Sequence, residues 1–281
     1  MRPPDPAAIV RPGEHACCRF ADRDDRRRAA AALVRDGLRR DHKVVYFVEN
    51  EDIGGFVGAL QEIDADVAPA IASGQLEVRP SRDAYTPDGT FEMERMLTPV
   101  HDHGADALVD GYAGLSITGE IGGALVGAPG AERLDEYERC LDAMDRPNSV
   151  LLCQYDHRRF DAGLLSGVAD RHDVDLSPEL ATIGRDGMLA AARVRPGTLR
   201  IAGELDFGCA STLAEVLDAH FHGPLTLDLA DLHYVDVTGM RALRGRKAQR
   251  VMISSASESV RRLVGLLGWD TDPDVEMAVA A

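Results

Sequence analysis

The chain has 281 residues, 45% of them hydrophobic and 5% aromatic, which is long enough for two cores of ordinary domain size. Its 31 Lys and Arg residues against 47 Asp and Glu residues give a formal net charge of -16, which disfavours nucleic acid and anionic lipid as direct partners. No apolar run of about 18 residues could span a bilayer, and the first residues lack the apolar region of a secretory signal, so we expect a cytoplasmic protein.

The five cysteines are an odd number at wide spacings, in a chain without a secretion signal. This pattern indicates free thiols rather than a disulfide framework. They are Cys17, Cys18, Cys140, Cys153 and Cys209.

Short β-rich runs alternate with segments of helical spacing over the first 172 residues. Strands are predicted at 16–20, 43–49, 76–79, 107–110 and 149–155, and helices at 26–40, 53–63, 91–104, 132–144 and 161–171. A glycine-rich stretch, 111–130, interrupts the alternation. The pattern predicts right-handed βαβ units on a mostly parallel sheet, in a domain over residues 13–172.

Residues 173–187 lose the periodicity and are predicted to be a linker. A second, smaller α/β domain over 188–276 then opens with two strands, 188–194 and 198–205, joined as a hairpin. Its other strands are predicted at 225–229 and 250–254, and its helices at 211–220, 239–243 and 257–267.

Four motifs of the second domain resemble a STAS domain of the anti-sigma-factor antagonist kind. They are GELD at 203–206, LDLADLHYVD at 227–236, VTGMRAL at 237–243 and SVRRLVGLLGW at 259–269. The resemblance implies that an anti-sigma-factor kinase, a serine/threonine kinase, binds this domain and phosphorylates the hydroxyl of Thr238.

The local chemistry at Thr238 is compatible with such a switch. Asp236 ends a strand, Gly239 relieves backbone crowding, and Thr238 lies among the free N–H groups of the next helix. A phosphate would add about -1.5 to -2 charges close to Asp206 and Asp236. The alternative is that Thr238 only caps the helix. Eleven residues, 240–250, separate Gly239 from the next strand, which predicts a shortened helix.

Five motifs of the first domain resemble the MEDS family, a sensory domain named from methanogens, methylotrophs and a dichloromethane-responsive regulator. They are GEHACCRF at 13–20, VVYFVEN at 44–50, GLSITGEIGGAL at 114–125, EYE at 136–138 and LLCQYDHRRF at 151–160. That family is similar to RecA/KaiC-type nucleotide-binding folds, which implies a three-layer, mostly parallel sheet. The place of the phosphate loop holds ADRDDRRR, 21–28, without a glycine cradle or a lysine, so ATP hydrolysis is disfavoured.

Cysteine and histidine side chains, which can bind metal ions, lie on the first strand and at the last recognisable strand of this domain. If these strands are neighbours, thiolate and imidazole groups would meet and suit Zn²⁺ or redox sensing. The candidate ligands are His15, Cys17, Cys153 and His157, with Cys18 and Asp156 beside them. The alternative is that these cysteines are small apolar core residues.

A small organic effector would bind beyond the carboxyl ends of the parallel strands. The candidate residues at such ends are Glu49, Tyr85, Asp110, Tyr112, Glu120 and Asp156.

The sequence therefore predicts a signalling regulator and not an enzyme, since no GxSxG, HExxH or paired CxxC motif occurs. Its expected partners are an anti-sigma factor or kinase, a small-molecule effector and, in one version, a second copy in a homodimer. Two alternatives stay open: a degenerate KaiC-like nucleotide-binding enzyme, and an interaction scaffold in which Thr238 is never modified.

Overall fold

The computed structural model describes residues 9–20, 22–49, 53–62, 67–122, 125–160, 162–176, 180, 183, 189–245 and 249–278. They divide into two units, Val10–Asp175 and the chain from Leu176 onward together with Ile9. Each unit is an α/β domain with its own apolar core. No helix in these ranges is long and apolar enough to cross a membrane.

The sheet of the first unit has the strand order β6-β1-β5-β4-β2-β3. Its strands are β1 His15–Phe20, β2 His42–Val48, β3 Leu76–Pro80, β4 Gly114–Ile121, β5 Ser149–Asp156 and β6 Val174–Leu176. The four pairs from β1 to β3 along this order are all parallel. Helices on both faces bury such strands, which explains near-continuous apolar runs such as VVYFV.

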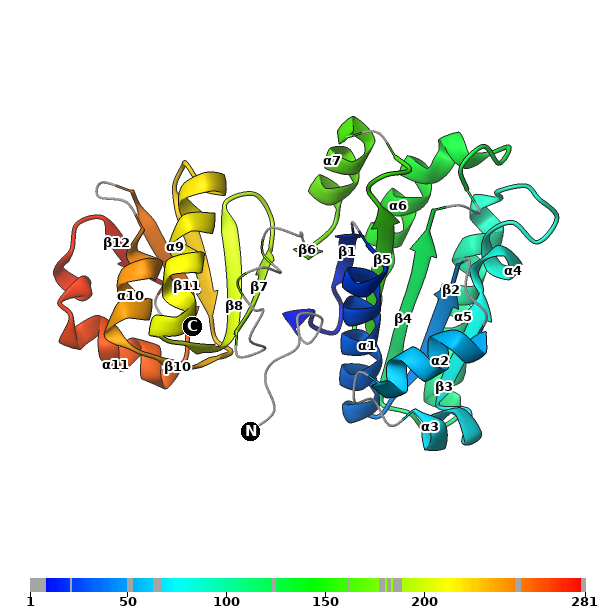
Figure 1. Ribbon diagram of the computed structural model, residues 1–281, viewed down its shortest axis with the longest axis horizontal. Helices are drawn as coiled ribbons and strands as arrows, with labels where there is room; N and C mark the ends of the chain where they lie inside the picture. Colours follow the sequence, from blue (N-terminus) through cyan, green and yellow to red (C-terminus); the bar gives the residue numbers. More distant parts are fainter. Residues whose placement is uncertain are drawn as a thin grey trace. The chain divides into compact units, whose positions relative to one another are not determined.

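The helices of this unit cover both faces of the sheet (Figure 1). They are α1 Arg23–Arg39, α2 Ile53–Glu62, α3 Ala68–Ala72, α4 Ser81–Tyr85, α5 Met93–Val109, the 3₁₀ turn η2 Ala131–Arg133, α6 Leu134–Ala143 and α7 Ala162–Arg171. α1 and α2 pack on one face, where Gly37 of α1 lies against Ser116 and Phe56 of α2 stacks on Tyr46. α5, α6 and α7 pack on the other face, around Leu115 and Ile117. The predicted three-layer α/β architecture is confirmed.

The fourth strand lies at a different place from the one predicted. Residues 107–109 are the last of α5 and Asp110 is its C-cap, whereas β4 lies inside the glycine-rich stretch. The glycines of β4 are required by close neighbours: a Cβ on Gly114 would lie 2.0 Å from the carbonyl oxygen of Asn148. Because glycine lowers strand propensity, sequence reasoning missed a strand that is buried along its whole length.

The predicted linker overlaps the end of the first sheet. Residues 174–176 form β6, because the chain returns to the sheet after α7. Most of the remaining predicted linker, residues 177–179, 181–182 and 184–188, lies outside the described residues. The short helices α3 and α4 were not predicted.

The second unit has a sheet with the order β12-β11-β9-β8-β7. β9 pairs with the first part of β8, and β10 pairs with the last part of the same strand. Its strands are β7 Leu189–Arg193, β8 Thr198–Leu205, β9 Leu225–Leu229, β10 Leu232–Val235, β11 Val251–Ala256 and β12 Val275–Met277. Its helices are α9 Phe207–His220, α10 Val237–Arg244, α11 Glu258–Leu266 and the 3₁₀ turn η3 Trp269–Thr271. β7 and β8 form the predicted antiparallel hairpin, and α10 is short, at 8 residues.

Gly119 of β4 offers a test of the packing in the first unit. A Cβ at this position would lie 1.6 Å from the hydroxyl oxygen of Tyr85, so Gly119→Ala forces a rearrangement of the core. We expect a loss of about 1–3 kcal/mol in the free energy of unfolding of the first unit, partly recovered by adding Tyr85→Phe. Urea unfolding followed by circular dichroism measures it.

The matched control is Gly58→Ala in α2, where a Cβ meets nothing within 4 Å. This change should stabilise the helix by about 0.5–1 kcal/mol. The single tryptophan, Trp269, reports the second unit by fluorescence and should not respond to either change. Equal stability of the two alanine variants would contradict the packing described above.

Candidate functional site

Two helices of the second unit begin side by side at one edge of its sheet. β8 ends at Leu205 and its parallel neighbour β10 ends at Val235, so α9 and α10 start close together. The Asp236 carboxylate accepts hydrogen bonds from the backbone N–H of Gly239 at 2.7 Å and of Phe207 at 3.0 Å. One carboxylate therefore caps α10 and also holds the first residue of α9.

Gly239 allows α10 to begin against β8. A Cβ on Gly239 would lie 2.6 Å from the carbonyl oxygen of Leu205, closer than real side chains approach backbone. Asp206 caps α9 by accepting the N–H of Gly208 at 2.8 Å. The predicted switch environment is thus a compact corner of two helix caps.

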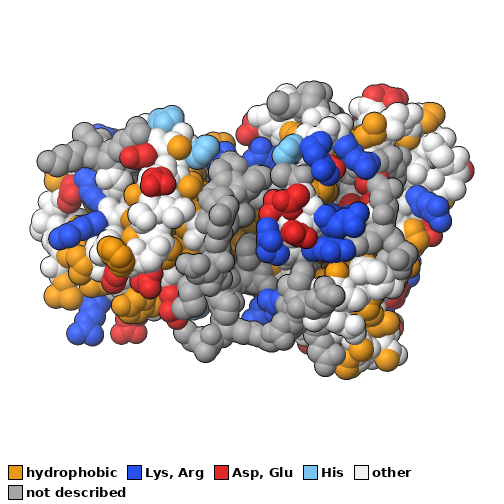
Figure 2. All heavy atoms as spheres, in the orientation of Figure 1, with side chains coloured by type: hydrophobic (Ala, Val, Ile, Leu, Met, Phe, Trp, Pro, Cys, Tyr) orange, Lys and Arg blue, Asp and Glu red, His pale blue; other side chains and the backbone are white. Residues whose placement is uncertain are grey.

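Thr238 is exposed at the second position of α10. Because the cap is Asp236, Thr238 is not the capping residue. Large apolar side chains around this corner are also exposed, namely Phe207 at 77%, Tyr234 at 51% and Val237 at 42%. Figure 2 shows hydrophobic side chains on the visible face over α10 and α11.

A second group of polar side chains is buried in the first unit, under α6. It consists of His15 on β1, Glu138 on α6, Cys153 on β5 and His172, which follows α7. Each offers one potential ligand atom, and these atoms all lie within 4.8 Å of one another. The pairing of β1 with β5 creates the group, since it sets the two strands side by side.

The side chains of this buried cluster point at a common centre. His15 Nε2 lies 3.3 Å from Cys153 Sγ and 3.4 Å from Glu138 Oε2. His172 Nε2 lies 3.3 Å from the same carboxylate oxygen. The centroids of the two imidazole rings are 4.0 Å apart, and the ring planes are tilted by 41°.

Partners outside the cluster hold three of its members, two through the side chain and one through the backbone. Val168 O accepts a hydrogen bond of 2.7 Å from His172 Nδ1, which leaves Nε2 to face the centre. The Tyr155 hydroxyl donates to Glu138 Oε1, so the other carboxylate oxygen faces the cluster. His15 is held through its backbone N–H, which donates to Asp173 Oδ2 at 2.9 Å.

Burial and mutual charge shift the titration of the cluster. Burial lowers the pKa of His15 well below its usual value, with further lowering from His172 and Arg146. Burial raises the pKa of the Cys153 thiol, and the Glu138 carboxylate raises it further. Burial alone would lower the pKa of His172, but Glu138, the Val168 carbonyl and Asp175 together outweigh it and the net shift is upward.

The structure brings together two of the four predicted metal ligands, His15 and Cys153. Cys17 is paired with Cys153 in the sheet, but its thiol donates to Asp175 Oδ1 at 3.6 Å. His157 is exposed beyond the end of β5 and is not part of the cluster. All five cysteines are free thiols, as predicted.

Sequence reasoning missed the other two members of the cluster. Glu138 lies in the EYE segment, which stood out in the sequence, but nothing local indicated that its carboxylate is buried. His172 lies just past a helix, where the sequence predicted the end of the domain. Only the packing of these two residues against β1 and β5 brings their side chains into one cluster.

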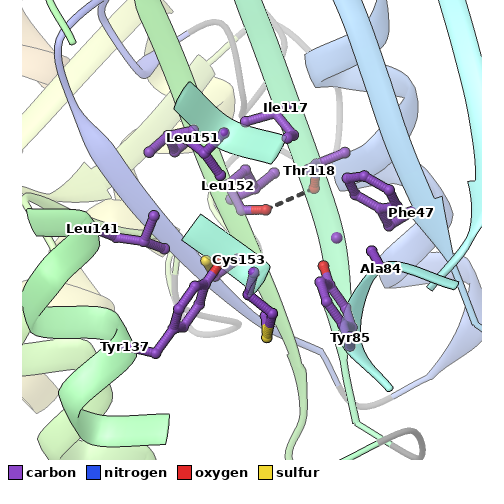
Figure 3. Close-up of a pocket in the computed structure, with 13 residues that line it drawn as sticks. Phe47, Ala84, Tyr85, Ile117, Thr118, Tyr137, Leu141, Leu151, Leu152 and Cys153 are labelled. Carbon is purple, nitrogen blue, oxygen red and sulfur yellow. Dashed lines mark hydrogen bonds between the residues drawn. The ribbon is translucent and has the colours of Figure 1, made fainter. Parts of the chain in front are cut away.

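An apolar cavity adjoins the cluster between the sheet and helices α4, α5 and α6 (Figure 3). Its wall includes Phe47, Tyr85, Ile117, Tyr137 and Cys153. Figure 3 shows Tyr85 and Tyr137 reaching toward it from two different sides. Cys153 belongs to both the cavity wall and the cluster.

Comparison with known families decides what these two units are. The family model "MEDS: MEthanogen/methylotroph, DcmR Sensory domain" matches residues 14–173, more than half of the chain. The chain belongs to the MEDS family. A STAS domain model matches residues 190–280, so a MEDS domain precedes a STAS domain, in the predicted order. This pair of domains is that of a signalling regulator of the anti-sigma-factor antagonist type, and both families are regulatory rather than catalytic.

No curated protein matches the chain. Among solved structures, the chain is similar to the flagellar accessory protein FlaH from Methanocaldococcus jannaschii, with 10% identity, a TM-score of 0.43, and coverage of 68% of this chain and 76% of that one. An uncharacterized protein from Pyrococcus horikoshii in complex with an unknown peptide has 14% identity, a TM-score of 0.48, and coverage of 68% and 87%. A KaiC-like protein from Pyrococcus horikoshii OT3 has 9% identity, a TM-score of 0.43, and coverage of 59% and 72%.

The predicted effector residues of the MEDS domain do not converge on one place. Tyr85 lines the cavity. Glu120 lies on the opposite face of the sheet, where it accepts hydrogen bonds from the Tyr46 hydroxyl at 2.5 Å and from Arg26 Nη1 at 2.8 Å. Glu120 is thus engaged within the core.

Glu49 and Asp156 lie at the carboxyl ends of β2 and β5, and Arg159 approaches both, at 3.7 Å and 3.5 Å. Asp110 and Tyr112 were predicted at the same edge, which is wrong. They precede β4, so they lie at its amino end, because residues 107–110, predicted as a strand, are the end of α5 and its C-cap.

The entrance of α1 in the MEDS domain is capped by a carboxylate. Asp22 Oδ1 accepts hydrogen bonds from the N–H groups of Asp24 and Asp25, at 2.9 Å and 2.8 Å. The N-terminus of a helix is a place where anions such as phosphate can bind. Here the same position carries a negative charge of the protein itself.

Glu120 gives the MEDS domain a predicted pH dependence. Burial raises its pKa to about 7 from 4.5, despite the attraction of Arg26. The folded state therefore keeps a proton that the unfolded chain has lost, and stability falls as pH rises from about 4.5 to about 7, by up to about 3 kcal/mol from this group.

Glu120→Gln removes this titration. We expect the free energy of unfolding of the variant, relative to the parent, to increase between pH 4.5 and pH 7.5, even though loss of the ion pair with Arg26 lowers it at both values. Urea unfolding at the two pH values measures the difference. A difference that stays constant or decreases would contradict the assignment.

Proposed function

We propose that the MEDS domain senses a small effector and that the STAS domain passes the signal on by binding an anti-sigma factor with kinase activity. Phosphorylation of Thr238 by that kinase then releases it and alters transcription through the freed partner. The observation that supports this most directly is the exposed hydroxyl of Thr238 beside the cap Asp236.

The corner around Thr238 has the character of a docking surface. Exposed apolar side chains such as Phe207 and Val237 offer anchors that a partner would cover. A phosphate there would add about -1.5 to -2 charges near the carboxylates of Asp206 and Asp236. Placing that charge in an apolar contact costs desolvation energy and adds repulsion, so the modified surface would bind the same partner more weakly.

The test uses the full chain and an anti-sigma-factor kinase of the same host. We expect phosphate incorporation at Thr238, none in Thr238→Ala, and an affinity for the kinase at least about tenfold lower in Thr238→Glu, which corresponds to about 1.4 kcal/mol. Mass spectrometry locates the phosphate, and isothermal titration calorimetry measures the affinity.

The matched control is Ser259→Ala. Ser259 is also an exposed hydroxyl at the second position of a helix of this domain, in α11. It should keep full phosphate incorporation and binding. Labelling that persists in Thr238→Ala, or that is lost in Ser259→Ala, would refute the switch at Thr238.

The apolar cavity of the MEDS domain supports the sensing part of the proposal. The cavity has a volume of about 30 Å³, room for a group the size of one or two water molecules, so the matching probe is a single apolar atom. Xenon under pressure should raise the temperature of the MEDS unfolding transition, because a ligand of the folded state stabilises it. Ala84→Leu should abolish this shift by filling the wall, whereas Ala72→Leu, at an exposed helical alanine, should preserve it. A temperature shift of equal size in both variants would show that the probe does not bind in this cavity.

A further inference from the structure

We propose that the buried cluster of the MEDS domain is a binding site for a divalent transition metal, with Zn²⁺ favoured by the donor set. Its ligands are His15, Glu138, Cys153 and His172. This inference deepens the proposed sensory role but does not depend on phosphorylation of Thr238.

The spacing of the donor atoms fits tetrahedral coordination. Zn²⁺ bonds of about 2.0–2.3 Å at tetrahedral angles separate ligand atoms by about 3.3–3.6 Å. In the structure, His15 Nε2 lies 3.3 Å from Cys153 Sγ and 3.4 Å from Glu138 Oε2, and His172 Nε2 lies 3.3 Å from Glu138 Oε2. Cys153 Sγ lies 3.9 Å from Glu138 Oε2. Small side-chain movements would therefore complete the site.

The chemistry of the donors also fits. Two imidazoles, one thiolate and one carboxylate are ligand types that Zn²⁺ accepts. The thiolate of Cys153 and the carboxylate of Glu138 would neutralise the two positive charges of the metal. A neutral site suits a place where all four side chains are buried.

Two of the four ligands, His172 and Glu138, have the outer partners that metal ligands commonly have, whereas His15 Nδ1 has none among the described residues. A metal-binding histidine usually donates its other ring N–H to a carbonyl or carboxylate, and a ligating carboxylate is itself hydrogen-bonded. Here His172 Nδ1 donates to Val168 O, and Tyr155 donates to Glu138 Oε1. His172 Nε2, which is fully buried, makes no hydrogen bond to a described residue and faces the centre.

The competing account is a buried ion pair between protonated His172 and Glu138, with Cys153 as a thiol beside them. That account explains the 3.3 Å approach of His172 to the carboxylate. In that account the Cys153 thiol donates to the same oxygen at 3.9 Å, and His15 Nε2 lies 3.3 Å from the sulfur. The two accounts differ in metal content and in the state of the sulfur.

The first measurement uses the tag-free full chain, purified without chelators after growth with zinc. Elemental analysis should find about one zinc per chain. Replacement by Co²⁺ should give the visible d–d bands of a tetrahedral site and a near-ultraviolet thiolate-to-cobalt charge-transfer band. A parent protein that holds no metal after growth with zinc and gives no such spectrum with Co²⁺ would overturn the proposal, without any variant.

The variants then assign the ligands. Cys153→Ser should remove the charge-transfer band, and Glu138→Gln and His172→Gln should each reduce bound zinc from about one equivalent to below about a tenth. Cys140→Ser is the matched control, because Cys140 is a free thiol on α6, the helix that carries Glu138. Circular dichroism of each variant confirms folding. A charge-transfer band that survives in Cys153→Ser, or is lost in Cys140→Ser, would place the metal elsewhere.

A phosphorylation assay at Thr238 distinguishes failure of the metal site from failure of the proposed function. A metal-free parent that is still phosphorylated at Thr238 would remove the metal site and leave the switch intact. A zinc-loaded protein that is never phosphorylated would support the metal site and refute the switch at Thr238.

Discussion

The parallel pairing of β1 with β5 is the constraint on which the sensory site depends. It sets Cys17 opposite Cys153 and His15 opposite Leu151, so one face of the two strands presents imidazole and thiol groups to α6. Side chains alternate between the two faces along a strand, and this alternation decides which residues can contact Glu138. His157, beyond the end of β5, is outside this geometry.

Both faces of the MEDS sheet carry buried charged groups. Arg26 of α1 pairs with Glu120 of β4 on one face, and Glu138 of α6 pairs with His172 on the other. Desolvation makes such groups costly, and well-packed apolar residues often give equal or greater stability. Buried, mutually perturbed groups beside a cavity are more typical of functional sites, and the proposed sensory role gives the second pair a purpose.

The STAS domain uses the opposite principle, because its chemistry lies at the surface. The carboxylate of Asp236 satisfies the N–H groups that open two helices, and Gly239 lets the second helix start against β8. Thr238 is left exposed in the first turn of a capped helix. A change of charge at such a place alters the surface offered to a partner without disturbing the core.

The sequence by itself determined the domain order, the three-layer class of the MEDS domain, the hairpin that opens the STAS domain and the exposed place of Thr238. These follow from local periodicity, turns and motifs. It failed at β4, because glycines that a crowded sheet requires resemble those of a loop, and that error misplaced Asp110 and Tyr112. The ligand atoms of Glu138 and His172 were decided only by tertiary structure, because burial and convergence depend on which distant segments pack together, and no local pattern encodes that.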